Sequence, residues 1–182
     1  QKGRIQKLNY ADVACARVEN CEPIPLMEEL LGDFPEACFN IDPKSDTAVR
    51  PLIEIIKRTA SEDRVCVGSF SDHRLRQIRS ALPQVCTSMA TYEAARAKLN
   101  SLGVRLGSLS ANCAQVPVRW NGVSVVDRRF IQTMKGQGIP VHVWTINDAS
   151  EMHQLLDMGV DGIMTDRPSV LKAVLLERGS WN

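Results

Sequence analysis

Residues 141–163 read Val141-His-Val-Trp-Thr-Ile-Asn-Asp-Ala-Ser-Glu-Met-His-Gln-Leu-Leu-Asp-Met-Gly-Val-Asp-Gly-Ile163 and contain a complete strand–helix–strand pattern. The short apolar run at the start is typical of a buried parallel strand. Asp148 with Glu151 three residues later predicts the start of a helix, and Gly159 predicts its end. A second short apolar run follows, so this stretch predicts a unit of two parallel strands joined by a helix.

The same pattern repeats along the chain from Cys38 onward. The predicted strands are short apolar runs at Cys38–Asp42, Val65–Ser69, Val85–Ser88, Cys113–Val116, Val141–Ile146 and Gly162–Thr165. The predicted helix caps between or after them are Asp46 or Thr47, Ser71, Asp127, Asp148 and Asp166. This alternation predicts an α/β fold with helices packed outside a parallel sheet. Two architectures fit it, an open doubly wound sheet and a (β/α)8 TIM barrel that lacks its first two strand–helix units.

Length and composition predict one ordinary globular domain over residues 1–182. The 22 Lys and Arg balance 21 Asp and Glu, so charge gives no reason to expect nucleic acid or an anionic membrane as the main partner. Every apolar run is too short to span a bilayer, and no signal-peptide pattern is visible. Because the chain begins with Gln1, we expect an upstream segment to be missing from it. Residues 1–23 are weakly patterned and predict a surface loop before a helix at Pro25–Leu31.

The six cysteines contain no C-x-x-C pair, and the three histidines are too scattered to complete a zinc site. Three of the cysteines lie inside apolar runs, where a reduced thiol acts as a small hydrophobe. A chain of this length does not require disulfides for stability. We therefore expect reduced thiols and a cytoplasmic location.

The stretch Asn40-Ile-Asp-Pro-Lys44 is the sharpest candidate for chemistry, because reactive groups of such folds lie at the carboxyl ends of strands. Alternation points Asn40, Asp42 and Lys44 one way and Ile41 the other. A carboxylate suits a hard cation and an ammonium suits a phosphate, so Asp42 is a candidate metal ligand and Lys44 a candidate phosphate contact. The alternative is a surface ion pair that contributes little.

Trp144 is a second candidate, although a tryptophan after apolar residues also suits plain packing. His142 shares its parity and is more typical of a satisfied core residue than of a catalyst. The remaining polar residues near strand ends are Ser69, Gln115, Thr145, Asn147, Thr165, Asp166 and Arg167.

Five stretches, taken in order, resemble the glycerophosphodiester phosphodiesterases. They are Ile24-Pro-Leu-Met-Glu-Glu-Leu-Leu31, Phe39-Asn-Ile-Asp-Pro-Lys44, Val67-Gly-Ser-Phe70, Val141-His-Val-Trp-Thr-Ile-Asn147 and Gly159-Val-Asp-Gly-Ile-Met-Thr-Asp-Arg-Pro168. The resemblance runs from about Ile24 to the C-terminus. It implies a metal-dependent (β/α)8 barrel of lipid metabolism that hydrolyses glycerophosphodiesters to an alcohol and glycerol 3-phosphate.

The resemblance also implies roles for three residues. Asp42 matches the family's third metal-binding carboxylate, where many members have Glu, and the implied ion is calcium or magnesium. Lys44 matches the active-site lysine near the phosphate, and Trp144 matches the aromatic residue at the glycerol end of the pocket.

The family's His-Arg-Gly motif, its Glu-x-Asp pair and its second histidine are absent from residues 1–182. We therefore expect residues 24–182 to hold barrel strands three to eight, and residues 1–23 to be the remnant of an insertion. The parent protein is then a phosphoric diester hydrolase, and this chain alone is inactive. One alternative is a non-catalytic barrel that binds a phosphorylated metabolite. A weaker one makes Lys44 the Schiff-base nucleophile of an aldolase-like barrel. Head group and oligomeric state stay open.

Overall fold

The computed structural model describes residues 5–104 and 106–181, and this part of the chain contains six parallel strands at its centre. They are β3 (Phe39–Ile41), β4 (Val65–Val67), β5 (Cys86–Thr87), β6 (Ala114–Pro117), β9 (Val141–Trp144) and β10 (Gly162–Ile163). Strands β3, β4 and β5 pair in that order, as do β6, β9 and β10, and a bridge between Ser88 and Cys113 joins the two groups. All six predicted strands are therefore confirmed.

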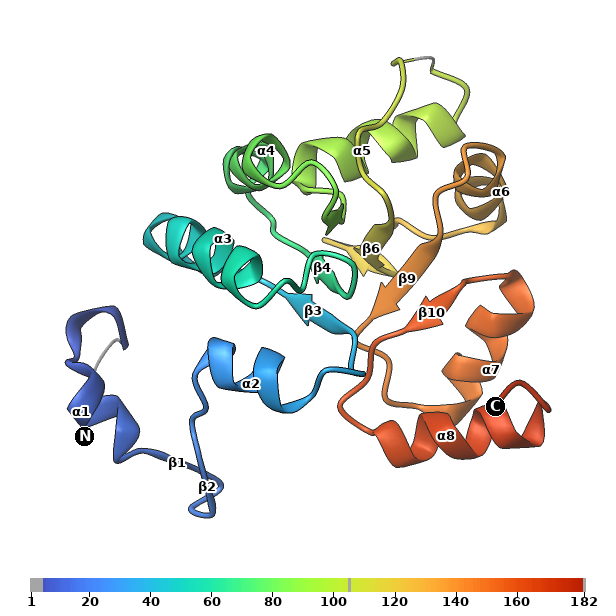
Figure 1. The fold of residues 1–182 in the computed structure, drawn as a ribbon. Helices are drawn as coiled ribbons and strands as arrows, with labels where there is room; N and C mark the ends of the chain where they lie inside the picture. The colour runs from blue at the N-terminus through green and yellow to red at the C-terminus, as the bar shows by residue number, and fades with distance from the viewer. Residues whose placement is uncertain (1–4, 105, 182) are drawn as a thin grey trace.

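Helices follow the strands and lie outside them (Figure 1). They are α3 (Val49–Arg58), α4 (Asp72–Ala81), α5 (Thr91–Ser101), α6 (Arg128–Gly136), α7 (Ala149–Met158) and α8 (Pro168–Glu177), with α2 (Met27–Asp33) before β3. Among the described helices, none has both the length and the apolar character that a membrane span requires.

The strands follow one another in chain order, as in the wall of a barrel, whereas a doubly wound sheet reverses its order at a switch point. A hydrogen bond across the inner face shows that the wall is strongly curved. Gln115 Nε2 on β6 donates to Asn40 Oδ1 on β3 at 3.1 Å. Asn40 Nδ2 also lies 3.9 Å from the sulfur of Met164, just after β10. However, no strand pair of the described residues joins β3 to β10. The described strands therefore form a curved wall of six strands that does not close into a barrel.

The core lies between this wall and the helices, because strand residues alternate between the two faces. Val65 and Val67 are buried and belong to one apolar cluster with Ile56 and Leu75 of the neighbouring helices. A second cluster surrounds Phe130 of α6, which is fully buried. The opposite face of the strands carries polar and sulfur-containing side chains, and this face lines the candidate site.

Four predicted helix ends are confirmed by hydrogen bonds or by backbone geometry. Ser71, Asp127 and Asp148 each accept a hydrogen bond from the backbone N–H three residues later, at 3.4, 2.8 and 2.9 Å. Gly159 ends α7 in the left-handed region, with φ of 99°, which glycine adopts without steric cost.

Two predicted caps are wrong. Residues Asp46–Ala48 form a 3-10 turn (η2) ahead of α3, and Asp46 accepts instead from Arg74 Nε at 2.6 Å, which lowers its pKa. Asp166 does not cap α8, since Arg167 stands at the cap position before Pro168. Instead, the Asp166 carboxylate accepts a hydrogen bond from Asn147 Nδ2 at 3.2 Å.

The N-terminal segment lies apart from the strands (Figure 1). It holds a 3-10 turn η1 (Ile5–Lys7), a short helix α1 (Tyr10–Ala14) and an antiparallel hairpin of β1 (Arg17–Val18) and β2 (Glu22–Pro23). Of the side chains described before Leu31, none is buried. A second hairpin, β7 (Arg119–Trp120) with β8 (Val123–Ser124), follows β6.

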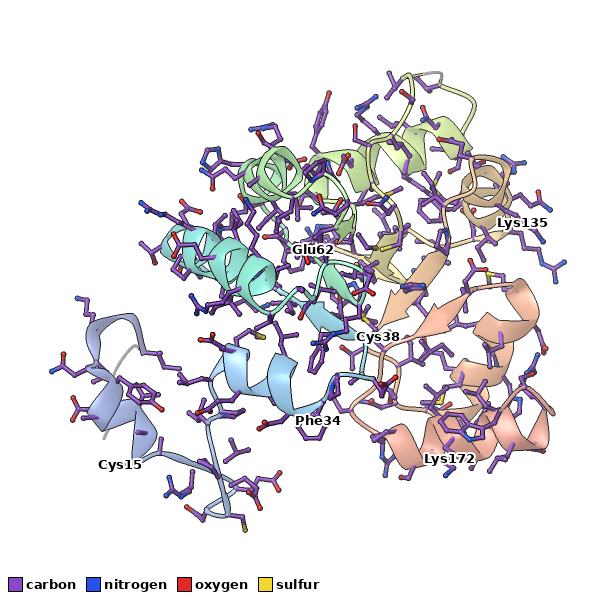
Figure 2. The ribbon with its side chains drawn as sticks, in the orientation of Figure 1. Cys15, Phe34, Cys38, Glu62, Lys135 and Lys172 are labelled. Carbon is purple, nitrogen blue, oxygen red and sulfur yellow. The ribbon has the colours of Figure 1, made fainter. Side chains whose placement is uncertain are left out.

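Charged side chains occupy the outer surface of the helices. Figure 2 shows Lys135 on α6 and Lys172 on α8 pointing away from the strands. Cys15 and Cys38 lie in separate parts of the molecule in the same view. All six cysteines are free thiols.

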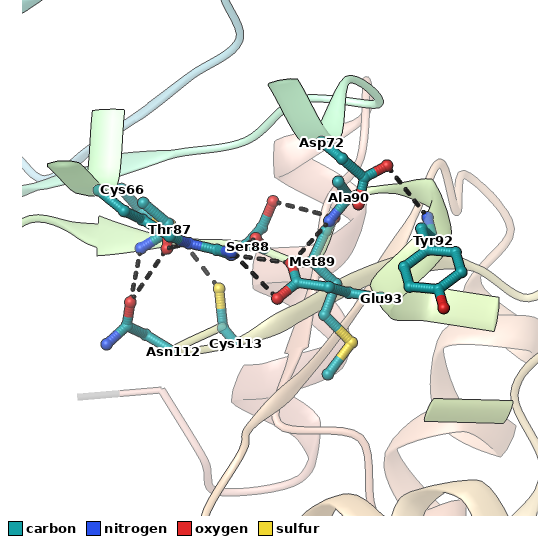
Figure 3. Close-up of polar contacts among 11 residues, drawn as sticks. Cys66, Asp72, Thr87, Ser88, Met89, Ala90, Tyr92, Glu93, Asn112 and Cys113 are labelled. Carbon is teal, nitrogen blue, oxygen red and sulfur yellow. Dashed lines mark hydrogen bonds and ion pairs between the residues drawn. The ribbon is translucent and has the colours of Figure 1, made fainter. Parts of the chain in front are cut away.

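The ion pair between Arg79 and Glu93 is largely buried and links β5 to α4 and α5. Arg79 donates to both carboxylate oxygens of Glu93 at 2.9 and 3.0 Å, and also to Thr87 Oγ1 and to the Ser88 carbonyl. Glu93 reaches back to the backbone N–H of Ala90 at the start of α5 (Figure 3). The pair therefore satisfies the first turn of α5 and fixes the end of β5.

Candidate active site

A pocket of about 290 Å³ opens at the carboxyl ends of the strands. Each of the six parallel strands contributes to it. The lining residues are Asn40, Asp42, Lys44, Gly68, Ser69, Phe70, Ser88, Met89, Gln115, Trp144, Thr145 and Met164. Parallel strands bring their carboxyl ends to one edge, so the sequence predicts this location from strand direction alone.

Asp42 and Lys44 form the charged side of the pocket. Lys44 Nζ lies 2.5 Å from Asp42 Oδ2, and the two side chains are 80% and 31% exposed. Ile41 between Asn40 and Asp42 is buried on the helix side, as alternation predicts. The structure therefore brings Asp42 and Lys44 together in the lining, where they also form the ion pair that the alternative interpretation expects.

The floor of the pocket is made of amides and small residues. Gln115 and Asn40 are hydrogen-bonded across the curved wall at 3.1 Å. A side chain at Gly68 would place its Cβ 3.0 Å from Gln115 Oε1 and 3.2 Å from Ser88 Oγ. A side chain at this position would therefore crowd the side chains of the floor.

Aromatic rings form another part of the lining. The ring of Phe70 packs edge-on against Trp144, with centroids 5.7 Å apart, and lies 6.0 Å from the ring of Trp120. Trp144 is partly buried and lines the pocket. Val141 and Val143 of the same strand are buried on the helix side. The pocket lining therefore contains both apolar aromatic rings and a charged pair.

The three histidines lie away from the pocket lining. His142 packs over Gly162, where an added Cβ would be 2.8 Å from the ring. His73 contacts Gln77 on α4, and His153 on α7 lies 3.4 Å from a Glu177 carboxylate oxygen. The described pocket therefore contains no imidazole to serve as a general acid or base.

Asp42 is the one carboxylate among the described lining residues. Calcium takes six to eight oxygen ligands and magnesium takes six, several of them charged or water. The carboxylate of Asp42 is a suitable hard ligand, but this donor set is too small for either ion. The described lining residues therefore supply one ligand of a calcium or magnesium site and do not form a complete site.

The other polar residues near strand ends divide into two groups. Ser69, Gln115 and Thr145 line the pocket. The remaining residues join two loops beside it, because Asn147 Oδ1 accepts from Thr165 Oγ1 and from the Asp166 backbone N–H, both at 2.9 Å.

Sequence reasoning missed the aromatic partners of Trp144. Phe70 follows the end of β4, where strand alternation no longer predicts a direction. Trp120 lies in the β7–β8 hairpin, whose turn holds Asn121 and Gly122 with φ of 48° and 82°. An Asn-Gly pair between two short strands is the usual signal of a tight hairpin, so this element was predictable.

The profile of the "Glycerophosphoryl diester phosphodiesterase family" matches residues 4–170, which include every residue of the pocket lining. The chain belongs to this family. Several curated relatives are named as glycerophosphodiester phosphodiesterases, and the family is one of phosphoric diester hydrolases. The "Probable glycerophosphodiester phosphodiesterase 2" of Mycobacterium tuberculosis is 36% identical over 186 residues, which are 99% of this chain and 70% of that protein.

Solved structures of glycerophosphodiester phosphodiesterases share the fold. One from Parabacteroides distasonis superposes with a TM-score of 0.74 at 20% identity and covers 96% of this chain and 74% of that one. A phosphodiesterase from Oleispira antarctica, solved in complex with the product sn-glycerol-3-phosphate, gives 0.74 at 17% identity over 95% and 72% of the two chains. At these identities the similarity shows a shared fold. The six-stranded wall with its outer helices is part of that fold.

Proposed function

We propose that the pocket binds a glycerophosphodiester, and that the complete active site hydrolyses it to an alcohol and glycerol 3-phosphate with a divalent metal ion, calcium or magnesium. Water adds to phosphorus, the bond from phosphorus to the alcohol oxygen breaks, and the alcohol leaves with a proton. The observation that carries the proposal is the pairing of a cationic side with an aromatic side in one pocket. A glycerol phosphate has the matching charged and uncharged ends.

Lys44 is proposed to meet the phosphate. Its ammonium lies at the end of β3 on the pocket side and is exposed, so an anionic ligand reaches it without rearrangement of the core. Three N–H donors on one ammonium suit phosphate oxygens. Contact with Lys44 would stabilise the negative charge that these oxygens carry during hydrolysis.

Asp42 is proposed as one metal ligand, with the ion neutralising phosphate oxygens when bound. Its bond to Lys44 at 2.5 Å keeps the carboxylate oriented toward the pocket. The chemistry of a carboxylate at a strand end supports this role, and the shorter reach of Asp compared with Glu sets how close the ion must lie.

Trp144 is proposed to line the glycerol end. Its contact with Phe70 holds the ring on the pocket side. An aromatic face packs against the carbon atoms of a small polyol while leaving its hydroxyl groups free to bind water or protein.

Residues 1–182 are proposed to be inactive by themselves, as strands three to eight of a barrel whose remaining units supply the histidines and two further carboxylates. The rival is a non-catalytic barrel that binds a phosphorylated metabolite. The aldolase alternative is weaker: a Schiff-base lysine acts as a neutral amine in a dry site, whereas Lys44 is 80% exposed and ion-paired. A cytoplasmic location is part of the proposal, because six free thiols suit a reducing compartment.

Lys44→Met is expected to weaken binding of glycerol 3-phosphate to this chain by at least about tenfold, or roughly 1.4 kcal/mol. The reason is the loss of the ammonium contact to phosphate. Isothermal titration calorimetry measures the affinity. The matched control is Lys57→Met, because Lys57 is an exposed lysine at the far end of α3. Equal affinities for wild type and Lys44→Met would remove Lys44 from the site.

A further inference from the structure

Three thiols meet on the inner face of the strands, below the pocket. The sulfur of Cys66 on β4 lies 3.7 Å from that of Cys113 and 3.2 Å from that of Cys86 on β5, and all three lie within 4.8 Å of one another. Figure 3 shows Cys66 and Cys113 beside the end of β5. We call Cys66, Cys86 and Cys113 the thiol cluster.

Strand register explains why these residues meet. Cys66 and Cys86 are partners in the β4–β5 ladder, and Cys113 enters through the bridge to Ser88 that joins the two groups of strands. The spacings of 20 and 27 residues follow no zinc motif, so the sequence predicts no metal site here. The cluster forms because the wall is curved and the three side chains share its inner face.

The geometry is that of ligands around one ion. Zinc–sulfur bonds of about 2.3 Å at tetrahedral angles place two sulfur atoms about 3.8 Å apart. The observed contacts of 3.2 and 3.7 Å are close to that spacing, so the sulfur atoms need little movement to bind a shared ion. Cys113 is 2% exposed and the other two are partly buried. By contrast, Cys15, Cys21 and Cys38 are exposed, and among residues 5–104 and 106–181 they belong to no such group.

The neighbouring sulfur atoms shift the pKa of each thiol in the cluster. Hydrogen bonds from Cys113 and Cys66, with a smaller effect of His142, lower the pKa of the Cys86 thiol, despite its partial burial. The hydrogen bond with Cys113 lowers the pKa of Cys66, but its bond with Cys86 and its burial raise it overall. The pKa of Cys113 is raised by both sulfur neighbours. An ion that binds the cluster would displace the thiol protons, because the thiolate is the form that binds metal.

We propose that Cys66, Cys86 and Cys113 form a three-thiolate site for one thiophilic metal ion of the class of zinc, with a fourth position left open. The ion would join β4 and β5 to the start of β6. The bridge from Ser88 to Cys113 joins the two groups of strands at the same place. Gln115 lies between this site and the pocket, since its Nε2 is 3.6 Å from the sulfur of Cys66. The site shares no residue with the proposed phosphodiester site, so each stands or falls alone.

Cobalt(II) is the probe, because its thiolate complexes show ligand-to-metal absorption in the near ultraviolet. Titration into the reduced chain is expected to give this band with one ion per chain, and zinc in equal amount is expected to abolish it. Calcium in large excess is expected to leave it unchanged, which separates this site from one built on Asp42. A chain that shows no thiolate band overturns the proposal.

Single variants Cys66→Ser and Cys113→Ser are expected to weaken cobalt binding by at least about a hundredfold, since each removes one thiolate. Cys38→Ser is the control and is expected to bind as wild type, because that thiol is exposed and outside the cluster. Circular dichroism without metal reports whether each serine variant is folded. If a variant is not folded, alkylation of the wild-type chain tests the site instead. Zinc is expected to protect three thiols from modification, and mass spectrometry should identify them as the thiol cluster. Protection of other cysteines, or unchanged cobalt affinity in Cys113→Ser, contradicts the assignment.

Discussion

Replacing Glu93 with glutamine is expected to lower the free energy of unfolding by about 3–5 kcal/mol. The Glu93 side chain is 9% exposed, and both of its oxygens accept hydrogen bonds from Arg79. The glutamine keeps the shape and removes the charge, so the Arg79 guanidinium remains largely buried without a counter-ion. Denaturation in urea, followed by circular dichroism, measures the loss.

The matched control for this prediction is Glu54→Gln on α3. Arg50 and Glu54 form an ion pair whose side chains are 90% and 55% exposed. Exposed pairs one helical turn apart contribute little to stability, so this variant is expected to unfold at the midpoint of wild type. If the two variants unfold at the same denaturant concentration, the Arg79–Glu93 pair does not hold β5 and α5 in the way that its contacts indicate.

The second large effect concerns catalysis. We expect residues 1–182 to hydrolyse glycerophosphocholine at least about 10⁴-fold more slowly than the same chain extended at its N-terminus by the two strand–helix units of the family. Two histidines acting as general acid and base account for a factor of this size, and the described pocket holds neither. The measurement is release of glycerol 3-phosphate with calcium or magnesium present.

Two further results sharpen this test of catalysis. In the extended chain, Asp42→Asn is expected to weaken the dependence of the rate on metal concentration and to lower activity, because a charged ligand is lost. Comparable turnover by the two chains would show that residues 1–182 hold a complete site. If the extended chain is also inactive while it binds glycerol 3-phosphate, the non-catalytic alternative is supported.

The strands were predictable from sequence because each is short, apolar and bounded by turn residues. Residues such as Val65 and Val67 face the helices, and their alternation with the inner face is visible in the sequence. Helix α5 gave a weaker signal, because its buried face is formed by Ala97, Ser101 and Glu93 rather than by large apolar residues. Its start lacks a capping side chain at Ala90, and Glu93 supplies the missing acceptor from inside the helix.

The location of the pocket was also predictable, since strand direction determines which ends carry Asp42, Lys44 and Trp144. The contacts between side chains of the pocket depend on the curvature of the wall, which cannot be read from a local sequence pattern. Asn40 meets Gln115 from 75 residues away because the wall bends between β3 and β6. The same bend brings the thiols of the cluster together.

Competition for one side chain explains the misplaced caps. Asp46 and Asp166 are both good cap residues by type. Each is instead bound by a side chain from another part of the chain, Arg74 and Asn147 respectively. A preference that acts over three residues therefore gives way to a contact that forms with the tertiary fold.

The measurement that tests the central claim most directly is a crystal structure of this chain with bound glycerol 3-phosphate. We expect the phosphate within hydrogen-bonding distance of Lys44 Nζ, and the glycerol carbons against the ring of Trp144. Lys57→Met crystals are expected to show the same ligand, and Lys44→Met crystals treated identically are expected to show an empty pocket. Ligand bound elsewhere on the chain, or a pocket that stays empty in wild type at saturating ligand, would contradict the account.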